Sequence, residues 1–197
     1  MLGLLLMFNA TAMFVCTLLS VYLNDGATEG LLFSALITIG IGLLLLIITR
    51  NRKRKIKMRD GYLTVVMGWL SMVIFGTLPY LLTQSLVSYS DALFETMSGF
   101  TATGATIVQD IEALPKSIIL WRSLTHWLGG MGIIVLAVAI LPLLGIGGVQ
   151  LFSAEATAVG GDKLHPRISY TAKRLWYIYV GFTVLEALML VFAGMSV

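Results

Sequence analysis

The chain has 197 residues, of which 58% are apolar and only 12% are charged. A soluble globular domain usually carries about 25% charged residues, so the composition excludes that class of protein. The mean hydropathy of +0.93 points instead to a protein that lies in a membrane. The single cysteine, Cys16, excludes an internal disulfide framework.

Predominantly apolar runs follow one another along the chain, and each reaches the length of about 20 residues that a helix needs to cross a bilayer. The first two are separated only by the turn-like residues 25–29, so they predict a helical hairpin. No basic residues precede the first run, so we expect a span there rather than a secretory signal peptide. The pattern predicts an all-α membrane protein with five transmembrane helices, at Met1–Asn24, Gly30–Thr49, Gly61–Ser90, Ser123–Ala154 and Leu175–Val197.

The orientation of these spans follows from the basic residues of the short loops. Seven of the thirteen Lys and Arg residues lie between Arg50 and Arg59. Such loops are retained on the cytoplasmic side, which places this loop and the N-terminus inside. The loop from Glu155 to Arg174 falls on the same side and is also basic, so both assignments agree. We further expect the cluster to contact anionic lipids, and not nucleic acid.

Residues 88–106, SYSDALFETMSGFTATGAT, fit neither a span nor an ordinary loop. Ser88 followed three residues later by Asp91 resembles a capping box, which predicts a helix beginning near residue 89 or 90. Gly99 and the Thr/Gly-rich residues after it end this helix after about two turns. A helix too short to span, followed by irregular backbone and a new span, is the pattern of a re-entrant loop.

The candidate ion-binding segment is Thr101, Ala102, Thr103 and Gly104. A short helix that runs inward aims its negative C-terminal end at the membrane interior, which favours a cation there. Successive backbone carbonyls can then replace the water shell of a dehydrated ion. Gly104 would supply a backbone conformation that a Cβ disfavours. The alternative reading is an extracellular loop with turn residues.

Two ionisable residues flank this segment, Glu95 on the short helix and Arg122 at the outer start of the fourth span. We expect them to pair and to support the filter, with separate solvation at the outer surface as the alternative. Gly129 and the glycines after it would let the fourth span approach a neighbouring helix closely, with a hinge as the alternative role. The spans hold no constellation of side chains at catalytic spacing, so we do not expect an enzyme.

Three stretches of the chain resemble a known family: FETMSGFTATGAT, LPKSIILWRSLTHWLGGMGIIVLAVAILPLLGIGGVQLFSAE and HPRISYTAKRLWYIYVGFT. They are similar to the Trk/Ktr/HKT superfamily of potassium transporters, and within it to the TrkH-type pore-forming subunits. The resemblance covers most of the chain from about Arg59 onward. It implies potassium uptake across the bacterial inner membrane through a filter at Thr101–Gly104, with K⁺ as the transported ion and no organic cofactor. Many members carry a hydroxyl or branched residue where this sequence has Ala102.

The resemblance also implies a pore of four non-identical repeats, each built from a helix, a re-entrant pore helix with a filter, and a second helix. Residues 1–60 would then form an N-terminal hairpin with a basic loop, and residues 61–148 the first repeat. Residues 149–197 would form a cytoplasmic loop and the first helix of a second repeat, so we expect a longer protein. The expected partners are a second copy of the protein, cytoplasmic nucleotide-binding regulatory subunits, and membrane lipids.

Two other functions stay open at this stage. One is a small cation channel in which four copies of the chain each donate one filter. The other is a non-conducting membrane scaffold or assembly subunit. Channel-like movement and symport are both compatible with the sequence.

Overall fold

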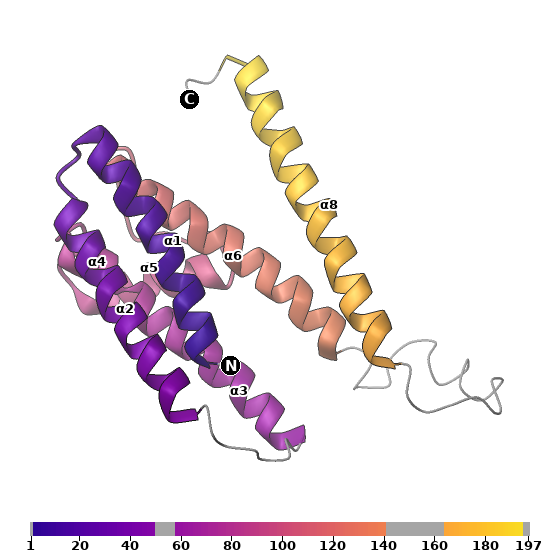
Figure 1. The fold of residues 1–197 in the computed structure, drawn as a ribbon. Helices are drawn as coiled ribbons and strands as arrows, with labels where there is room; N and C mark the ends of the chain where they lie inside the picture. The colour runs from indigo at the N-terminus through magenta and orange to yellow at the C-terminus, as the bar shows by residue number, and fades with distance from the viewer. Residues whose placement is uncertain (1, 50–57, 141–163, 195–197) are drawn as a thin grey trace, which may run out of the picture. The chain divides into compact units, whose positions relative to one another are not determined.

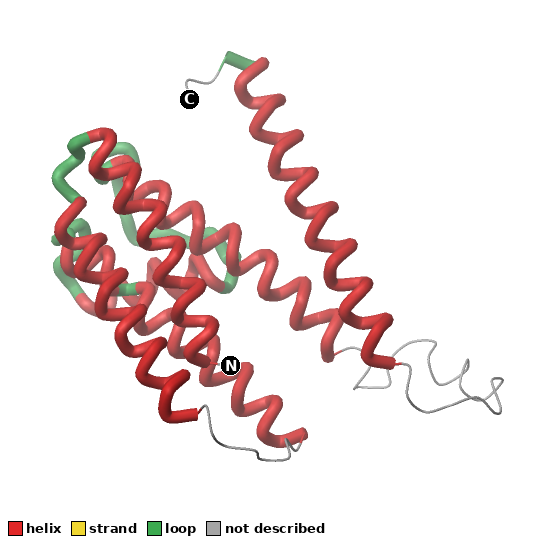
Figure 2. Tube along the Cα trace, viewed as in Figure 1, coloured by secondary structure: helices red, strands yellow, loops and turns green. Residues whose placement is uncertain are grey.

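The computed structural model describes residues 2–49, 58–140 and 164–194, and every regular element in these residues is an α-helix (Figures 1 and 2). The chain forms two compact units, Met1–Gly129 and Gly130–Val197. The first holds α1 to α5 and the N-terminal part of α6, and the second holds the rest of α6 with α8. The fold therefore confirms the expected all-α class.

The helices α1 (Leu2–Leu23) and α2 (Thr28–Thr49) form the predicted hairpin. The chain reverses between them through Asn24 and Gly26, whose φ angles are +51° and +81°. Small residues bring the helices together near the other end, where a Cβ added to Gly3 would lie only 2.6 Å from the carbonyl oxygen of Gly42. The two long apolar runs thus pack on each other through small residues rather than interlocked large side chains.

The third apolar run is divided into α3 (Met58–Gly76) and the short α4 (Leu78–Leu82). Pro79 lies in the first turn of α4, where its missing N–H costs nothing. The run therefore contains one long helix followed by a separate short segment.

Four helical segments within the described residues are long and apolar enough to cross a membrane: Leu2–Leu23, Thr28–Thr49, Leu63–Leu82 and Lys173–Phe192. They match four of the five predicted runs. The remaining run coincides with α6 (Lys116–Ile140) over residues 123–140, and its last part, residues 141–154, lies outside the described residues.

Two helices begin earlier than the charge pattern predicted. The helix α6 begins at Lys116 instead of Ser123, because Arg122 is paired within the fold and does not interrupt the helix. The helix α8 runs over Leu164–Phe192, so residues 164–174 of the expected cytoplasmic loop are helical. Charged residues mark where a helix leaves the apolar layer, and they do not end the helix itself.

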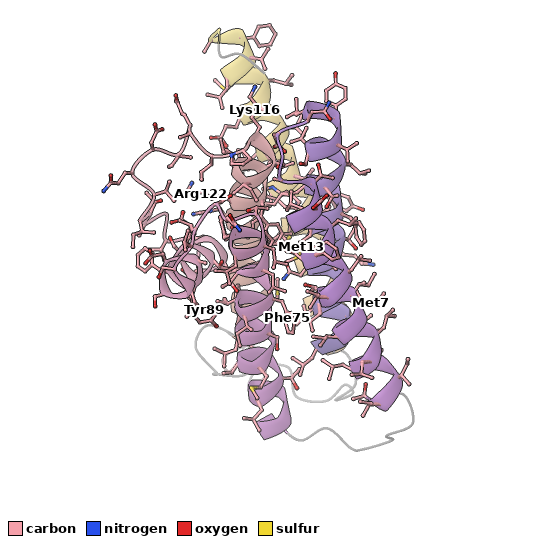
Figure 3. The ribbon with its side chains drawn as sticks, turned by 90° about the vertical axis from the view of Figure 1, so that its left-hand side faces the viewer. Met7, Met13, Phe75, Tyr89, Lys116 and Arg122 are labelled. Carbon is pink, nitrogen blue, oxygen red and sulfur yellow. The ribbon has the colours of Figure 1, made fainter. Side chains whose placement is uncertain are left out.

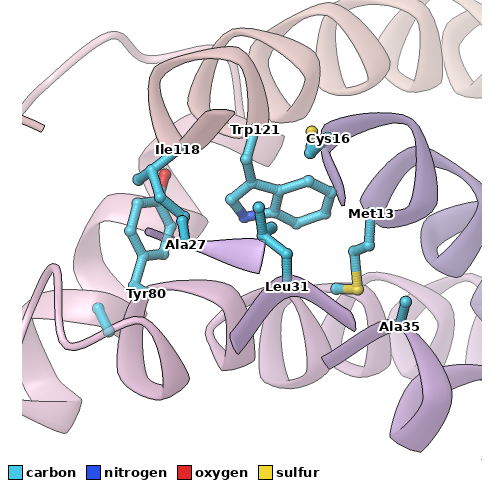
Figure 4. Packing of buried hydrophobic residues seen from close by; sticks show 9 residues of the cluster. Met13, Cys16, Ala27, Leu31, Ala35, Tyr80, Ile118 and Trp121 are labelled. Atoms are coloured by element: carbon cyan, nitrogen blue, oxygen red, sulfur yellow. The ribbon is translucent and has the colours of Figure 1, made fainter. Parts of the chain in front are cut away.

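The core of the first unit surrounds the indole of Trp121, which is fully buried (Figure 4). Leu31 of α2 and Met13 and Cys16 of α1 lie around it. This cluster joins the N-terminal hairpin to α6, because the residues around the indole come from both helices of the hairpin.

The carboxylate of Asp25 in the hairpin turn completes the N-terminus of α6. Its Oδ2 accepts a hydrogen bond of 2.9 Å from the backbone N–H of Ser117, while Oδ1 accepts bonds from Ser20 Oγ at 2.5 Å and from the Ala27 N–H at 3.2 Å. Partial burial raises the pKa of Asp25, but hydrogen bonds from Ser117, Ser20 and Ala27 outweigh it, so the pKa lies below its ordinary value. A side chain from the first loop thus satisfies an N–H that α6 cannot satisfy internally.

Candidate ion-binding loop

The helix α5 (Tyr89–Phe100) carries the candidate filter at its C-terminal end. It begins at Tyr89 as predicted, but the capping box was wrong in one respect, because the Ser88 side chain makes no capping hydrogen bond. The helix also lasts three turns instead of two. The low helix propensity of Gly99 is overridden because Gly99 and Phe100 are both buried.

The backbone folds tightly at the end of α5. The N–H groups of Thr101, Ala102 and Thr103 donate to the carbonyls of Met97, Gly99 and Ser98 at 2.9, 2.9 and 3.0 Å. Gly104 has a φ of +77°, the left-handed conformation expected of it, and Ala102 has a φ of +53°, which the sequence did not predict. The segment is therefore a defined turn and not an extended linker.

Hydroxyl groups hold the shape of this loop. Ser98 Oγ donates to the carbonyl oxygen of Ala105 at 2.5 Å and so bridges the base of the loop. The hydroxyls of Thr101 and Thr103 lie 2.7 Å apart, within hydrogen-bonding distance. Sequence reasoning did not single out Ser98, although a serine one turn before a Thr/Gly-rich loop is a common loop anchor.

A buried carboxylate fastens the far end of the loop. Glu95 has no exposed surface, and its oxygens accept hydrogen bonds from Thr106 Oγ1 at 3.0 and 3.1 Å and from the Ile107 N–H at 3.2 Å. Arg122 Nε of α6 donates to Glu95 Oε1 at 2.6 Å. The predicted pairing of Glu95 with Arg122 is present in the fold.

The pair brings one charge of α5 and one charge of α6 together. Arg122 keeps only 17% of its side-chain surface exposed, so both charges are largely removed from water. Figure 3 labels Arg122 on α6 and Tyr89 at the first turn of α5. Because Glu95 binds the loop and Arg122 at once, the loop, α5 and α6 share one electrostatic anchor.

The backbone carbonyls of Thr101–Gly104 accept no hydrogen bond from the residues that the structure describes. Residues 101–107 are all exposed in this chain. They follow the C-terminal, negative end of α5. Carbonyl oxygens at a negative helix end suit a dehydrated monovalent cation.

A site of the transition-metal kind is not found in the part of the chain that the structure describes, where His, Cys, Asp and Glu form no group of three or more. His126 instead places Nδ1 2.9 Å from the carbonyl oxygen of Arg122, one turn back on the same helix. This contact agrees with a structural role for the imidazole near the Glu95 anchor.

The apolar helices and the loop define an α-helical, multi-pass membrane protein. The family model described as "TrkH: Cation transport protein" matches residues 31–196. The chain therefore belongs to the TrkH family of cation transport proteins.

Relatives of this family align along nearly the whole chain. The Trk system potassium uptake protein TrkH of Halomonas elongata is 44% identical over 197 residues, covering 99% of this chain and 41% of the relative. The protein of the same name from Escherichia coli is 42% identical over 196 residues, covering 98% of this chain and 41% of the relative. The chain thus spans about two fifths of the length of these relatives.

A solved structure shares the fold. The crystal structure of the potassium transporter TrkH from Vibrio parahaemolyticus has a TM-score of 0.83 and 39% sequence identity, covering 98% of this chain and 38% of the solved chain. The arrangement of helices described above is therefore that of a TrkH-type protein.

Proposed function

We propose that this chain supplies one filter segment of a potassium-conducting pore and takes part in potassium uptake. The observation that carries the proposal is the exposed segment Thr101–Gly104, which follows the negative end of α5 and whose carbonyl oxygens have no donor among the described residues. Relatives named as potassium uptake proteins support K⁺ as the ion.

In this proposal α5 is a re-entrant pore helix and Glu95 with Arg122 supports the filter. The loop must keep its carbonyls at fixed positions to replace the water of an ion. Glu95 fixes the C-terminal end of the loop because its carboxylate accepts hydrogen bonds from Thr106 and Ile107. No organic cofactor and no catalytic step enter the mechanism.

One segment surrounds an ion on one side only, so the pore needs further segments. The chain holds the first of the four filters that a TrkH-type pore would use, and residues that correspond to the rest of the relatives would supply the others. We infer a bacterial inner-membrane location with the N-terminus inside, because the basic residues of 50–59 join α2 to α3. A homodimer and cytoplasmic nucleotide-binding regulatory subunits complete the proposed assembly.

The test is Rb⁺ uptake in cells that lack their own potassium uptake systems. Two proteins are expressed: the chain alone, and the chain joined to the remaining part of the Escherichia coli relative in place of the matching segment. Each is compared with its Gly104→Asp variant, in which a carboxylate disturbs the carbonyl row. Gly194→Asp is the matched control, since Gly194 has a φ of +88° and, like Gly104, has nothing within 4 Å of an added Cβ.

Each outcome has a distinct meaning. Uptake by the joined protein that Gly104→Asp abolishes and Gly194→Asp preserves is the expected result. Uptake by the chain alone would instead favour the small homo-oligomeric channel. A joined protein that inserts in the membrane and takes up no Rb⁺ would overturn the proposal and favour the non-conducting scaffold.

A further inference from the structure

Phe100, the last residue of α5, lies between two glycines on neighbouring helices. It is fully buried and comes directly before Thr101. A Cβ added to Gly76 of α3 would lie 2.9 Å from Cε2 of the Phe100 ring. A Cβ added to Gly129 of α6 would overlap the carbonyl oxygen of Phe100 and would lie 2.6 Å from its carbonyl carbon. One helix therefore limits the ring and the other limits the peptide group.

Other contacts make this joint rigid. The Trp121 Nε1–H of α6 donates to the carbonyl oxygen of Gly76 at 3.2 Å, which links the two helices on either side of α5. Thr125 of α6 lies directly beside Gly99, where a Cβ added to Gly99 would be 2.9 Å from the Thr125 Cβ. A Cβ added to Gly129 would also lie 2.8 Å from the Gly99 carbonyl oxygen. The last peptide groups of α5 thus lie against α6 with no free space.

We propose that Gly129 is a positioning residue for the candidate filter: by having no side chain, it sets the place of the Phe100–Thr101 peptide group and hence of the first filter carbonyl. The expected effect on ion preference rests on the proposed function. The contact between Gly129 and the Phe100 peptide group is independent of that function. A cation filter depends on where its carbonyls stand, and a binding constellation has to be held within about 0.5 Å of its working geometry.

The two glycines differ in what a methyl group would meet. At Gly76 the nearest atoms are Cγ2 of Thr96, at 2.7 Å, and Cε2 of the Phe100 ring, at 2.9 Å, so two buried side chains have to shift but no backbone atom is in the way. At Gly129 the nearest atoms are backbone carbonyl groups, which move only if the end of α5 moves. Gly76→Ala and Gly129→Ala are therefore the same change on two helices, with different effects on the filter backbone.

The first experiment measures the preference for K⁺ over Na⁺ in the chain joined to the remaining part of the Escherichia coli relative. The measured quantity is the ratio of the concentrations at which the two ions inhibit Rb⁺ uptake. Gly129→Ala is expected to change this ratio by about tenfold. Gly76→Ala is expected to change it less, since an added Cβ meets only side-chain atoms there, and Gly40→Ala is expected to leave it unchanged, since Gly40 has nothing within 4 Å of an added Cβ.

The second experiment needs no transport. The substitution Thr103→Cys is made in a background with Cys16→Ala. The rate at which a membrane-impermeant thiol reagent modifies the new thiol is then measured in membranes. Gly129→Ala is expected to change that rate more than Gly76→Ala does, and Gly40→Ala is expected to leave the rate unchanged. If Gly129→Ala does not reach the membrane, Thr125→Ala decides the matter, because it loosens the same joint at Gly99 without added bulk and is expected to change both quantities.

The outcomes separate the two proposals. A joined protein without uptake would contradict the proposed function, and the modification rates would still test the positioning role. If Gly129→Ala and Thr125→Ala gave the same ion ratios and the same modification rates as Gly40→Ala, the proposed role of Gly129 would be overturned.

Discussion

Replacing Glu95 by glutamine tests the central anchor of the loop most directly. The substitution keeps the size of the side chain and removes its charge, so Arg122 loses its counter-ion at a site where only 17% of its side chain is exposed. Removing one partner of a buried ion pair costs about 3–5 kcal/mol. Because part of the Arg122 side chain remains exposed to solvent, we expect the free energy of unfolding to fall by an amount near the lower end of this range, about 3 kcal/mol.

Thermal unfolding in detergent, followed by circular dichroism, measures this loss. A chain of this size shifts its Tm by about 2–4 °C for each kcal/mol, so Glu95→Gln is expected to lower the Tm by about 6–12 °C. The control is Glu112→Gln, which removes an exposed carboxylate shortly before α6 and should leave the Tm unchanged. The double variant Glu95→Gln with Arg122→Gln should be less destabilised than the sum of the two single variants, because it leaves neither charge unpaired. A Tm for Glu95→Gln within about 2 °C of the unsubstituted chain would refute the anchor.

Two further predictions concern the contacts of α6. Asp25→Asn is expected to cost about 1 kcal/mol at neutral pH, since the carboxylate caps the N–H of Ser117. The lowered pKa of Asp25 means that this contribution is complete above its ordinary value of 3.8 and is lost as the pH falls below it, so the difference in Tm between the two proteins should shrink in acid. Trp121→Phe removes the donor to the Gly76 carbonyl and is expected to cost about 1–3 kcal/mol in the same unfolding assay. An unchanged Tm would show that this carbonyl finds another donor.

The helices and the position of the loop could be predicted because the signals that define them are local. The long apolar runs gave the hairpin, and the Thr/Gly-rich residues after Ser98 gave the loop and the left-handed Gly104. The pairing of Glu95 with Arg122 was also accessible, because a charge next to a membrane span needs a partner.

What the sequence did not give were contacts between segments far apart in the chain. Asp25 bonds to Ser117 across 92 residues, and no local pattern marks one as the cap of the other. Gly129 was expected to allow close packing, but its neighbour, the Phe100 peptide group, follows only from how α5 lies against α6. The positive φ of Ala102 was not predicted for a similar reason. Alanine has no preference for the left-handed conformation, so the surrounding turn has to impose it.

The cap on α6 has a consequence for how the protein is made. A chain emerges from the ribosome N-terminus first, so the hairpin of α1 and α2 enters the membrane before α6 exists. The Asp25 carboxylate is then already held by Ser20 and Ala27 when the first turn of α6 arrives. The residue before that helix is Pro115, which has no side-chain acceptor to offer. The hairpin therefore presents an acceptor on which the first turn of the later helix is completed.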